Sequence, residues 1–503
     1  MPDFKTMKET ALNRPRRILL DNDGCDTVYE CATADKDVLL KQRTSYLPDS
    51  KVDTYFYCTW SSGIGVYTHN TKVGSVFDSK EIIFKNNKTR EFIDQGADCL
   101  DIIVEYCKDN NIEIFWTMRM NDVHDNHGAE YSRYMFESNR FKLDNPDCMI
   151  SSYGDRPPYG AGTAADFEKE KVRRLVLDSL KEVMENYNVD GIMLDFFRHP
   201  VFFKGPAYGT PATQEQLNIM TTLVKDIGQM AEDLGRARNR PFLIAARVPD
   251  SVEFCKTIGL DIETWLQEGL IDMLITSSYL QLNNWEYSVA LGHKYGIPVY
   301  PSLDESRIRD EQAKKLRHTL KAFRGRVMNV WNSGADGVFI FNNSGLKKED
   351  LIACIHEPLD NVLEYAGYDK DYFVSTRGPG AVAGSCYPHN EFINIPVLNP
   401  HNPIKIEPEN CKYTFIQLGD EGDYFSEKSF TLMLFVKDEI TPDNITVYFN
   451  GGLLQEGLYN HGAIAYRIDE KLIKSGTNII FIHNKSKNEI ILTDTMIKVR
   501  TNK

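Results

Sequence analysis

Residues 190–200 read DGIMLDFFRHP, a short apolar run that ends in an acid, an arginine and a histidine. An apolar run of this length, bounded by glycine and proline, predicts a buried strand. An acid followed by a base at the end of such a strand is hard to explain by packing alone. The stretch therefore predicts a strand with functional residues, catalytic or ligand-binding, at its carboxyl end.

Similar apolar runs recur along the first two thirds of the chain, and helical periodicity lies between them. Leu100, Ile103, Val104 and Cys107, for example, fall on one helix face. Strands that alternate with helices pair in parallel, and eight such units predict a closed α/β (β/α)8 barrel of the TIM type. A doubly wound open sheet is the competing fold, but no glycine-rich phosphate loop follows the first strand. The eight predicted strands are 17–23, 53–60, 113–121, 191–197, 242–248, 271–277, 297–303 and 337–342.

The pattern of apolar and polar residues changes after about residue 370. Helical periodicity stops and short alternating strands follow, with Asn450-Gly451-Gly452 as a tight hairpin turn. We therefore predict two domains, a catalytic barrel over 1–370 and a C-terminal β-sandwich accessory domain over 371–503.

The composition restricts the class of partner. The 503 residues contain 58 Lys and Arg against 72 Asp and Glu, a formal charge of −14. This charge argues against a nucleic-acid partner, and an anionic ligand needs a local cluster of arginines. No apolar run approaches the ~20 residues of a membrane span, so no membrane partner is expected. The first residues lack the apolar core of a signal peptide, which predicts a soluble protein, either cytoplasmic or exported with its leader absent from this sequence.

The ten cysteines are scattered without a Cys-x-x-Cys pair. Zinc sites and disulfide frameworks need clustered spacing, so buried free thiols are the better interpretation. The nearest pair, Cys25 and Cys31, is the one candidate for a disulfide, and we favour free thiols there too. The sequence also leaves open whether the chain forms a homodimer.

The end of the first predicted strand reads Leu20-Asp21-Asn22-Asp23-Gly24. Asp21 and Asp23 are two residues apart, so their side chains are expected to point to the same side of the strand, into the mouth of the barrel. Active sites of this fold lie at that end. Ordinary turn or helix-cap residues are the competing interpretation.

The third strand carries Arg119 at its polar end, and Asp122, His124 and His127 follow at once. A guanidinium at the end of an apolar strand must find an anion, and a histidine held by a carboxylate suits proton transfer. A structural Arg–Asp pair with solvent-facing histidines is the competing interpretation. Metal binding is less favoured because nothing fixes three or four ligands in register, so we predict no metal and no cofactor.

Arginines also follow the next two strands, at Arg198 and Arg247. Asp195 either transfers a proton or orients Arg198, and a plain ion pair is an equal alternative. Together with Arg119, these arginines come from three successive strands. Their convergence predicts a pocket for a carboxylate or a sulfate.

Neutral polar and aromatic residues follow other strands. Tyr279, Asn342 and Asn343 are candidates for binding hydroxyl and amide groups, and Trp60 is a candidate for stacking on a sugar face. Each of these residues has an equally good structural interpretation.

Two segments carry a resemblance to a known group. DGIMLDFFRHP and the segment 259–279, GLDIETWLQEGLIDMLITSSY, resemble barrel glycoside hydrolases of the bacterial glycosyl-hydrolase-like group. The acidic end of the first strand, the RMNDVHD segment and the asparagines after the eighth strand are similar to the inverting exosialidase family. The resemblance covers roughly residues 16–365.

The resemblance implies an exo-acting inverting sialidase that releases terminal sialic acid from a sialylated glycan or another anionic saccharide. His124 and either Asp21 or Asp23 would be essential for hydrolysis, with Asp122 and Asp195 as further candidate catalytic residues. Arg119 would hold the substrate carboxylate, helped by Arg198 or Arg247. Asn342 or Asn343 would bind near the glycosidic centre.

Three other functions stay open at the level of sequence. The first is a related barrel glycosidase that acts on a uronic acid or a neutral sugar. The second is a non-catalytic carbohydrate-binding protein. The third is a metal-dependent amide or ester hydrolase that uses His124, His127 and the aspartates.

Overall fold

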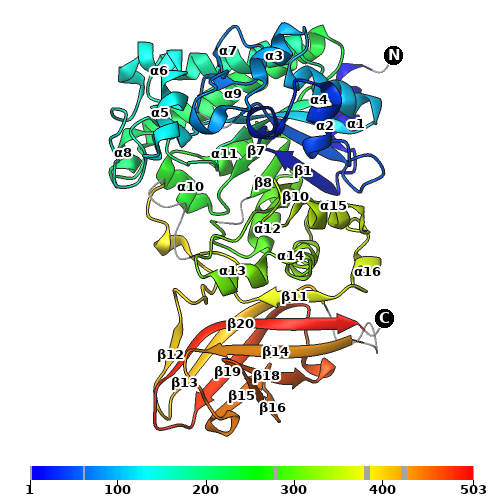
Figure 1. Ribbon diagram of the computed structural model, residues 1–503, viewed down its shortest axis with the longest axis vertical. Helices are drawn as coiled ribbons and strands as arrows, with labels where there is room; N and C mark the ends of the chain where they lie inside the picture. Colours follow the sequence, from blue (N-terminus) through cyan, green and yellow to red (C-terminus); the bar gives the residue numbers. More distant parts are fainter. Residues whose placement is uncertain (1–2, 61–62, 277–279, 379–385, 421–427, 502–503) are drawn as a thin grey trace.

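The structure is a computed structural model that describes residues 3–60, 63–276, 280–378, 386–420 and 428–501. Figure 1 shows a helix-covered barrel in the N-terminal part of the chain and a stack of antiparallel strands in the C-terminal part. Both predicted architectures are therefore present, in the predicted order.

Eight parallel strands close into a barrel, in the order β1-β10-β9-β8-β7-β6-β5-β2. Closure means that β1 pairs with both β2 and β10, so the open-sheet alternative is wrong. The strands are β1 (Ile18–Asn22), β2 (Thr54–Cys58), β5 (Glu113–Arg119), β6 (Gly191–Asp195), β7 (Leu243–Val248), β8 (Met273–Thr276), β9 (Val299–Leu303) and β10 (Val338–Phe341).

Helices surround the barrel, and a short parallel pair of β3 (Val66–Tyr67) and β4 (Ser75–Val76) lies in the connection from β2 to β5. The α-helices are α1 (Phe4–Leu12), α2 (Lys36–Arg43), α3 (Thr89–Asp94), α4 (Cys99–Asp109), α5 (Glu130–Glu137), α6 (Arg140–Asp144), α7 (Glu170–Asn186), α8 (Lys204–Ala207), α9 (Gln214–Ala237), α10 (Val252–Ile258), α11 (Ile262–Gln267), α12 (Trp285–Lys294), α13 (Glu311–Arg317), α14 (Leu320–Asn332), α15 (Lys348–His356) and α16 (Val362–Tyr365).

The inside of the barrel is filled in layers because every second residue of a strand points inward. An apolar layer that includes Leu19, Phe115 and Met193 fills the lower part. Two residues further along the same strands, Asp21 and Asp195 stand among the buried polar residues. The barrel therefore changes from apolar to charged toward the carboxyl ends of its strands, as the sequence predicted.

The C-terminal part consists of two antiparallel sheets, which confirms the predicted sandwich. One has the order β11-β20-β14-β18-β17 with β12 beside β20, and the other has the order β13-β19-β15-β16. The strands are β11 (Lys370–Phe373), β12 (Ile404–Ile406), β13 (Cys411–Leu418), β14 (Lys428–Val436), β15 (Ile445–Phe449), β16 (Gly452–Leu454), β17 (Leu458–Asn460), β18 (Ala463–Ile468), β19 (Gly476–Asn484) and β20 (Ile490–Thr501).

The barrel and the sandwich share a polar and packed junction. Arg317 of α13 donates to both carboxylate oxygens of Asp494 on β20, at 2.7 and 2.9 Å, and both side chains are buried. A buried bidentate pair of this kind fixes direction as well as distance. Helix α14 packs on β11 and β13, so the sandwich rests on a helix of the barrel.

All ten cysteines are free, and eight of them are buried. This agrees with the interpretation of buried thiols, and it includes Cys25 and Cys31. Among the helices that the structure describes, none has the length and apolar character needed to span a membrane.

Candidate active site

A cavity of about 510 Å³ opens at the carboxyl end of the barrel. We call it the mouth cavity. Five arginine or lysine side chains line it against two carboxylates, although the chain as a whole has a charge of −14. Its charged lining residues are Arg43, Arg119, Arg198, Arg307, Lys314, Asp23 and Glu305, and His318, Asn342 and Asn343 also line it.

Asp23 is the carboxylate of the first strand that faces this cavity. It forms an ion pair with Arg43 at 2.9 Å and accepts a hydrogen bond from Asn342 Nδ2 at 3.0 Å. The Asn342 side chain also accepts from the Asp23 backbone N–H, so the end of β10 holds the end of β1. Burial alone would raise the pKa of Asp23, but Arg43 and Arg119 lower it below the ordinary value. Asp23 is therefore ionised at neutral pH.

Gly24 makes the turn after Asp23. Its φ is +68°, and a Cβ there would lie 1.8 Å from the carbonyl oxygen of Cys58. Only glycine fits this position, because a side chain would collide with the backbone of β2. The glycine in the Asp21–Gly24 segment therefore lets Asp23 reach the rim.

Asp21 lies one layer deeper than Asp23 and is buried. Burial raises the pKa of Asp21 to about 8, against the opposing effect of Arg247 and Arg119. The two carboxylates predicted to share a direction thus differ in protonation: Asp21 keeps its proton at neutral pH and Asp23 does not. Asp23 is the member of the pair that a ligand in the cavity would meet.

A chain of hydrogen bonds joins the predicted arginine and histidine of the third strand. Arg119 Nη1 donates to Asp122 Oδ2 at 2.9 Å, and Asp122 Oδ1 lies 2.6 Å from His124 Nδ1. Arg198 Nη2 lies 2.8 Å from His124 Nε2. Arg119 and His124 are therefore brought together at the mouth, as the sequence predicted.

The partners of His124 fix its tautomer. A guanidinium only donates, so Nε2 accepts from Arg198, and Nδ1 carries the proton that Asp122 accepts. Burial, with a further effect of Arg198, lowers the pKa of His124 to about 4, although Asp122 opposes the shift. The result is a neutral imidazole, about a quarter exposed, whose lone pair is held by an arginine of the cavity.

Asp195 is fully buried. One of its oxygens accepts the backbone N–H groups of Phe197 and Arg198, at 3.0 and 3.1 Å, and the other lies 3.4 Å from Arg247. Of the roles considered for Asp195, the structure favours orientation: it shapes the turn that carries Arg198 and does not face the mouth cavity.

Arg247 also lies below the cavity, with no exposed surface. It forms an ion pair with Asp304 at 2.7 Å and lies 4.1 Å from the ring of Phe341. The predicted convergence of three arginines therefore holds for Arg119 and Arg198 at the surface of the cavity. Arg247 belongs to the buried layer of charge beneath them, where it contacts Asp195 and Asp304.

One aromatic prediction, Trp60, does not reach this site. Trp60 is 4% exposed and stacks on Phe77 with ring centroids 4.8 Å apart, in a cluster beside the barrel. Sugar stacking by Trp60 is therefore wrong, because its faces are covered by other aromatic rings. Tyr279 lies outside the described residues. Asn343 lines the cavity as predicted.

Sequence reasoning missed three of the five arginine and lysine side chains that line the cavity, Arg43, Arg307 and Lys314. Arg307, Lys314 and His318 follow β9, and Arg307 forms an ion pair with Glu305 at 3.0 Å. Arg307 lies just after the end of a strand, and this position could have predicted that it lines the cavity. Nothing in the sequence predicts the same for Arg43, because it is the last residue of helix α2, where a basic residue is ordinary.

Three histidines, His124, His127 and His199, bring one ring nitrogen each to within 4.8 Å of one another. Two of them are poorly suited to a metal ion. The lone pair of His124 Nε2 accepts from Arg198, and His199 Nδ1 accepts the backbone N–H of Val123 at 3.3 Å, which leaves a proton on Nε2. A cation beside Arg198 would also be repelled.

No protein-family model and no curated protein matches this chain. Solved structures match at low identity. The PgaB (BpsB) glycoside hydrolase domain from Bordetella bronchiseptica has a TM-score of 0.43 and 11% identity, over 69% of this chain and 98% of that one. An α-amylase from Anoxybacillus has a TM-score of 0.40 and 12% identity, over 94% and 98%.

A cycloisomaltooligosaccharide glucanotransferase from Paenibacillus sp. matches with a TM-score of 0.34 and 10% identity, over 96% of this chain. This chain spans 57% of the length of that protein.

Proposed function

We propose that this chain is a glycoside hydrolase that removes a terminal sugar bearing a carboxylate, with sialic acid as the preferred sugar. The observation that carries the proposal is the mouth cavity, which is lined by Arg119, Arg198 and the ionised Asp23, with the neutral imidazole of His124 bound to Arg198 next to the lining. In a strongly acidic chain, such a cavity selects an anion that the rest of the surface repels.

The arginines fit a carboxylate in particular. Guanidinium groups bind planar carboxylates through two parallel hydrogen bonds, and Arg119 and Arg198 both reach the cavity. Arg119 is held in place by Asp122, so its direction is set before a ligand arrives. A substrate carboxylate between Arg119 and Arg198 would lie next to His124.

Binding at Arg198 would also change His124. In the structure, Arg198 occupies the lone pair of His124 Nε2 and contributes to the low pKa of His124. A carboxylate that draws Arg198 away would free this lone pair and add negative charge nearby, and both effects raise the pKa. His124 would then accept a proton from the attacking water, with Asp122 stabilising the imidazolium.

Asp23 faces the same cavity and remains ionised, held by Arg43 and Asn342. Hydrolysis of a glycoside builds positive charge at the anomeric carbon as the bond to the leaving oxygen breaks. A fixed carboxylate stabilises that charge. Water adds to the anomeric carbon and loses its proton to His124, while the leaving oxygen takes up a proton from solvent, and His124 then returns its proton to solvent.

The finer assignment comes from the resemblance in the RMNDVHD segment. It favours an exo-acting enzyme that inverts the anomeric configuration. Inversion requires room for water between the two catalytic groups, and Asp23 and His124 belong to different strand ends, β1 and β5.

Hydrolysis of 3′-sialyllactose, followed by proton NMR of the first-formed sialic acid anomer, tests the proposal. The expected result is release of sialic acid with the opposite anomeric configuration to the substrate. Aryl glucuronides and neutral aryl glycosides serve as comparison substrates. Release only from glucuronides would replace sialic acid by a uronic acid, and release only from neutral glycosides would contradict the role of the arginines.

A further inference from the structure

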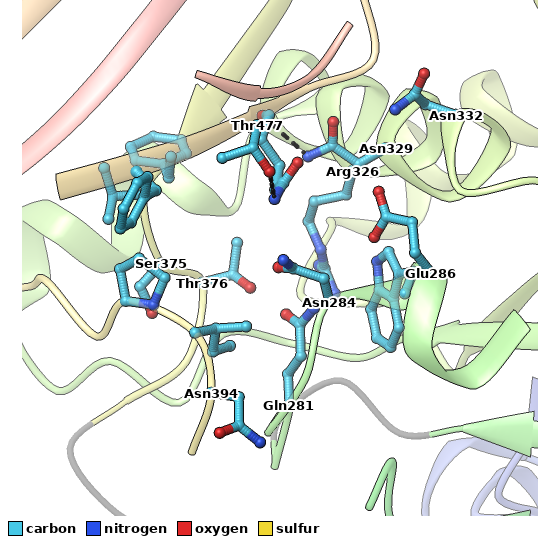
Figure 2. Close-up of a pocket in the computed structure, with 17 residues that line it drawn as sticks. Gln281, Asn284, Glu286, Arg326, Asn329, Asn332, Ser375, Thr376, Asn394 and Thr477 are labelled. Atoms are coloured by element: carbon cyan, nitrogen blue, oxygen red, sulfur yellow. Dashed lines mark hydrogen bonds between the residues drawn. The ribbon is translucent and has the colours of Figure 1, made fainter. Parts of the chain in front are cut away.

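A second cavity lies between the barrel and the sandwich and shares no lining residue with the mouth cavity. Its volume is about 230 Å³, and its walls come from α12, α14, the segment after β11, β13 and β19. Figure 2 shows polar side chains around it, with Gln281, Asn284 and Arg326 directed toward its centre. We call it the junction pocket.

The chemistry of the junction pocket is that of amides. Among the residues that the structure describes, two charged side chains line it, Arg326 and Glu286, and they have opposite signs. Arg326 already donates to the backbone carbonyl of Asp304 at 2.6 Å. The pocket thus suits an uncharged ligand, unlike the mouth cavity. Six amide side chains line it: Gln281, Asn284, Asn329, Asn332, Asn394 and Gln417.

Two amide oxygens of this pocket are buried without a hydrogen-bond partner among the described residues, Asn329 Oδ1 and Gln417 Oε1. Their amide nitrogens are in use: Asn329 donates to the Gln417 carbonyl at 3.3 Å, and Gln417 donates to Thr477 Oγ1 at 2.8 Å. Buried acceptors of this kind are costly unless a donor reaches them. A ligand hydroxyl is such a donor.

Aromatic rings continue from the pocket along the outer face of the sandwich. The register places Gln417 opposite Thr477, Phe415 opposite Ile479 and Tyr413 opposite Phe481. Tyr448 of β15 then stands opposite Phe481. Residues two apart on a strand share a face, so Gln417, Phe415 and Tyr413 form one row that leads out of the pocket. We call Tyr413, Phe415, Tyr448 and Phe481 the aromatic strip.

The aromatic strip is accessible. Tyr413 is 63% exposed, and Phe415 is half-buried and lines the pocket itself. The strip thus presents one exposed ring and three half-buried rings on a sheet face, the kind of surface that often marks a ligand site. The flat apolar faces of pyranose rings pack on such rings, while their hydroxyls suit the amides of the pocket.

We propose that the junction pocket and the aromatic strip bind a neutral saccharide. One sugar unit would enter the pocket, which is smaller than the ~300 Å³ at which drug-sized sites begin, and would donate hydroxyls to Asn329 and Gln417. The next units would lie on Phe415 and Tyr413. This site does not depend on the reaction proposed for the mouth cavity. If that reaction takes place, the junction pocket would hold the uncharged part of the glycan.

Saturation-transfer NMR and calorimetry on the full chain, with lactose and maltotriose as neutral probes, test the proposal. We expect at least one probe to bind, and N-acetylneuraminic acid not to compete for this site. Asn329→Leu keeps the side-chain shape and removes both the acceptor that lacks a partner and the hydrogen bond to the Gln417 carbonyl, so we expect weaker binding by about tenfold or more, and urea unfolding checks that the variant stays folded.

Tyr413→Ala is the second variant, because an exposed residue is replaced without a cost to folding. It is expected to weaken binding by a similar factor, and Asn218→Leu, at an exposed amide of α9, is the matched control that leaves binding unchanged. Arg119→Ala should also leave it unchanged, which separates this site from the proposed reaction. Absence of binding by both probes at millimolar concentration, or equal binding by both junction variants and the wild type, would overturn the proposal.

Discussion

The mouth cavity and the junction pocket are built from opposite chemistries. The mouth cavity gathers arginines, a lysine, carboxylates and a histidine, and its groups are held by charged partners such as Asp122. The junction pocket gathers amides and aromatic rings, and its two charged residues have opposite signs. The first arrangement suits an anion and proton transfer, whereas the second suits hydroxyl groups and flat apolar faces. A carboxylated sugar and a neutral one would therefore be separated between the two sites.

Replacing His124 is expected to cause the largest loss of the activity proposed for the mouth cavity. His124→Ala removes the proton acceptor and the partner of Arg198, and we expect kcat on a sialoside to fall by about 10²–10⁴-fold. Steady-state kinetics measure this effect. His127→Ala is the matched control, since His127 stands beside the same ring but outside the Asp122–His124–Arg198 chain. Equal losses in the two variants would contradict the role of His124.

Replacing Arg119 tests whether the mouth cavity selects its substrate by negative charge. Arg119→Ala should reduce kcat/KM for a carboxylated substrate by about 10²–10³-fold, because the group that positions the anion is lost. Arg119→Lys keeps the charge but not the paired geometry, and it should recover only part of the activity. Kinetics with a sialoside and with its carboxamide analogue provide the measurement. A loss of the same size on the uncharged analogue would exclude carboxylate binding by Arg119.

The buried acid beneath the cavity predicts a smaller effect, on stability. Asp21 has a raised pKa of about 8 in the folded chain, so between its ordinary pKa near 4 and about pH 8 the folded state holds a proton that the unfolded state has released. This term lowers the free energy of unfolding as the pH rises through that range, by at most about 1.4 kcal/mol per pH unit.

Asp21→Asn carries no such proton, so its stability should improve relative to the wild type from pH 5 to pH 8 and then remain level. Urea unfolding at pH 5, 7 and 9 measures the difference. A constant difference between the two proteins at all three values would show that Asp21 is ionised in the folded chain.

The sequence predicted the barrel and part of the mouth cavity because both depend on strand periodicity. Asp23, Arg119, Arg198 and the asparagines occupy strand ends, and a strand end in a parallel barrel has a known place. Depth within the barrel was not predictable, because Asp21 and Arg247 differ from their neighbours only by one layer. Such differences depend on where each strand stops.

The sequence also did not predict which residues of the helices and of the C-terminal sandwich line the two cavities. Arg43 reaches the cavity from the end of α2, and its sequence context is that of any exposed helix end. Trp60 looked available for stacking, but rings of Tyr29, Phe77 and Phe84, distant in sequence, cover it. The junction pocket depends on how α14 meets β13, which no local pattern encodes.

The most direct measurement of the central claim is the pKa of His124, followed by NMR of the histidine ring during a pH titration with and without N-acetylneuraminic acid. We predict a value of about 4 in the free chain and a clear rise when the acid is bound, because its carboxylate draws Arg198 away from Nε2. The methyl ester of the same sugar, which lacks the negative charge, should leave the pKa in place. An unchanged pKa at saturating N-acetylneuraminic acid would contradict the account.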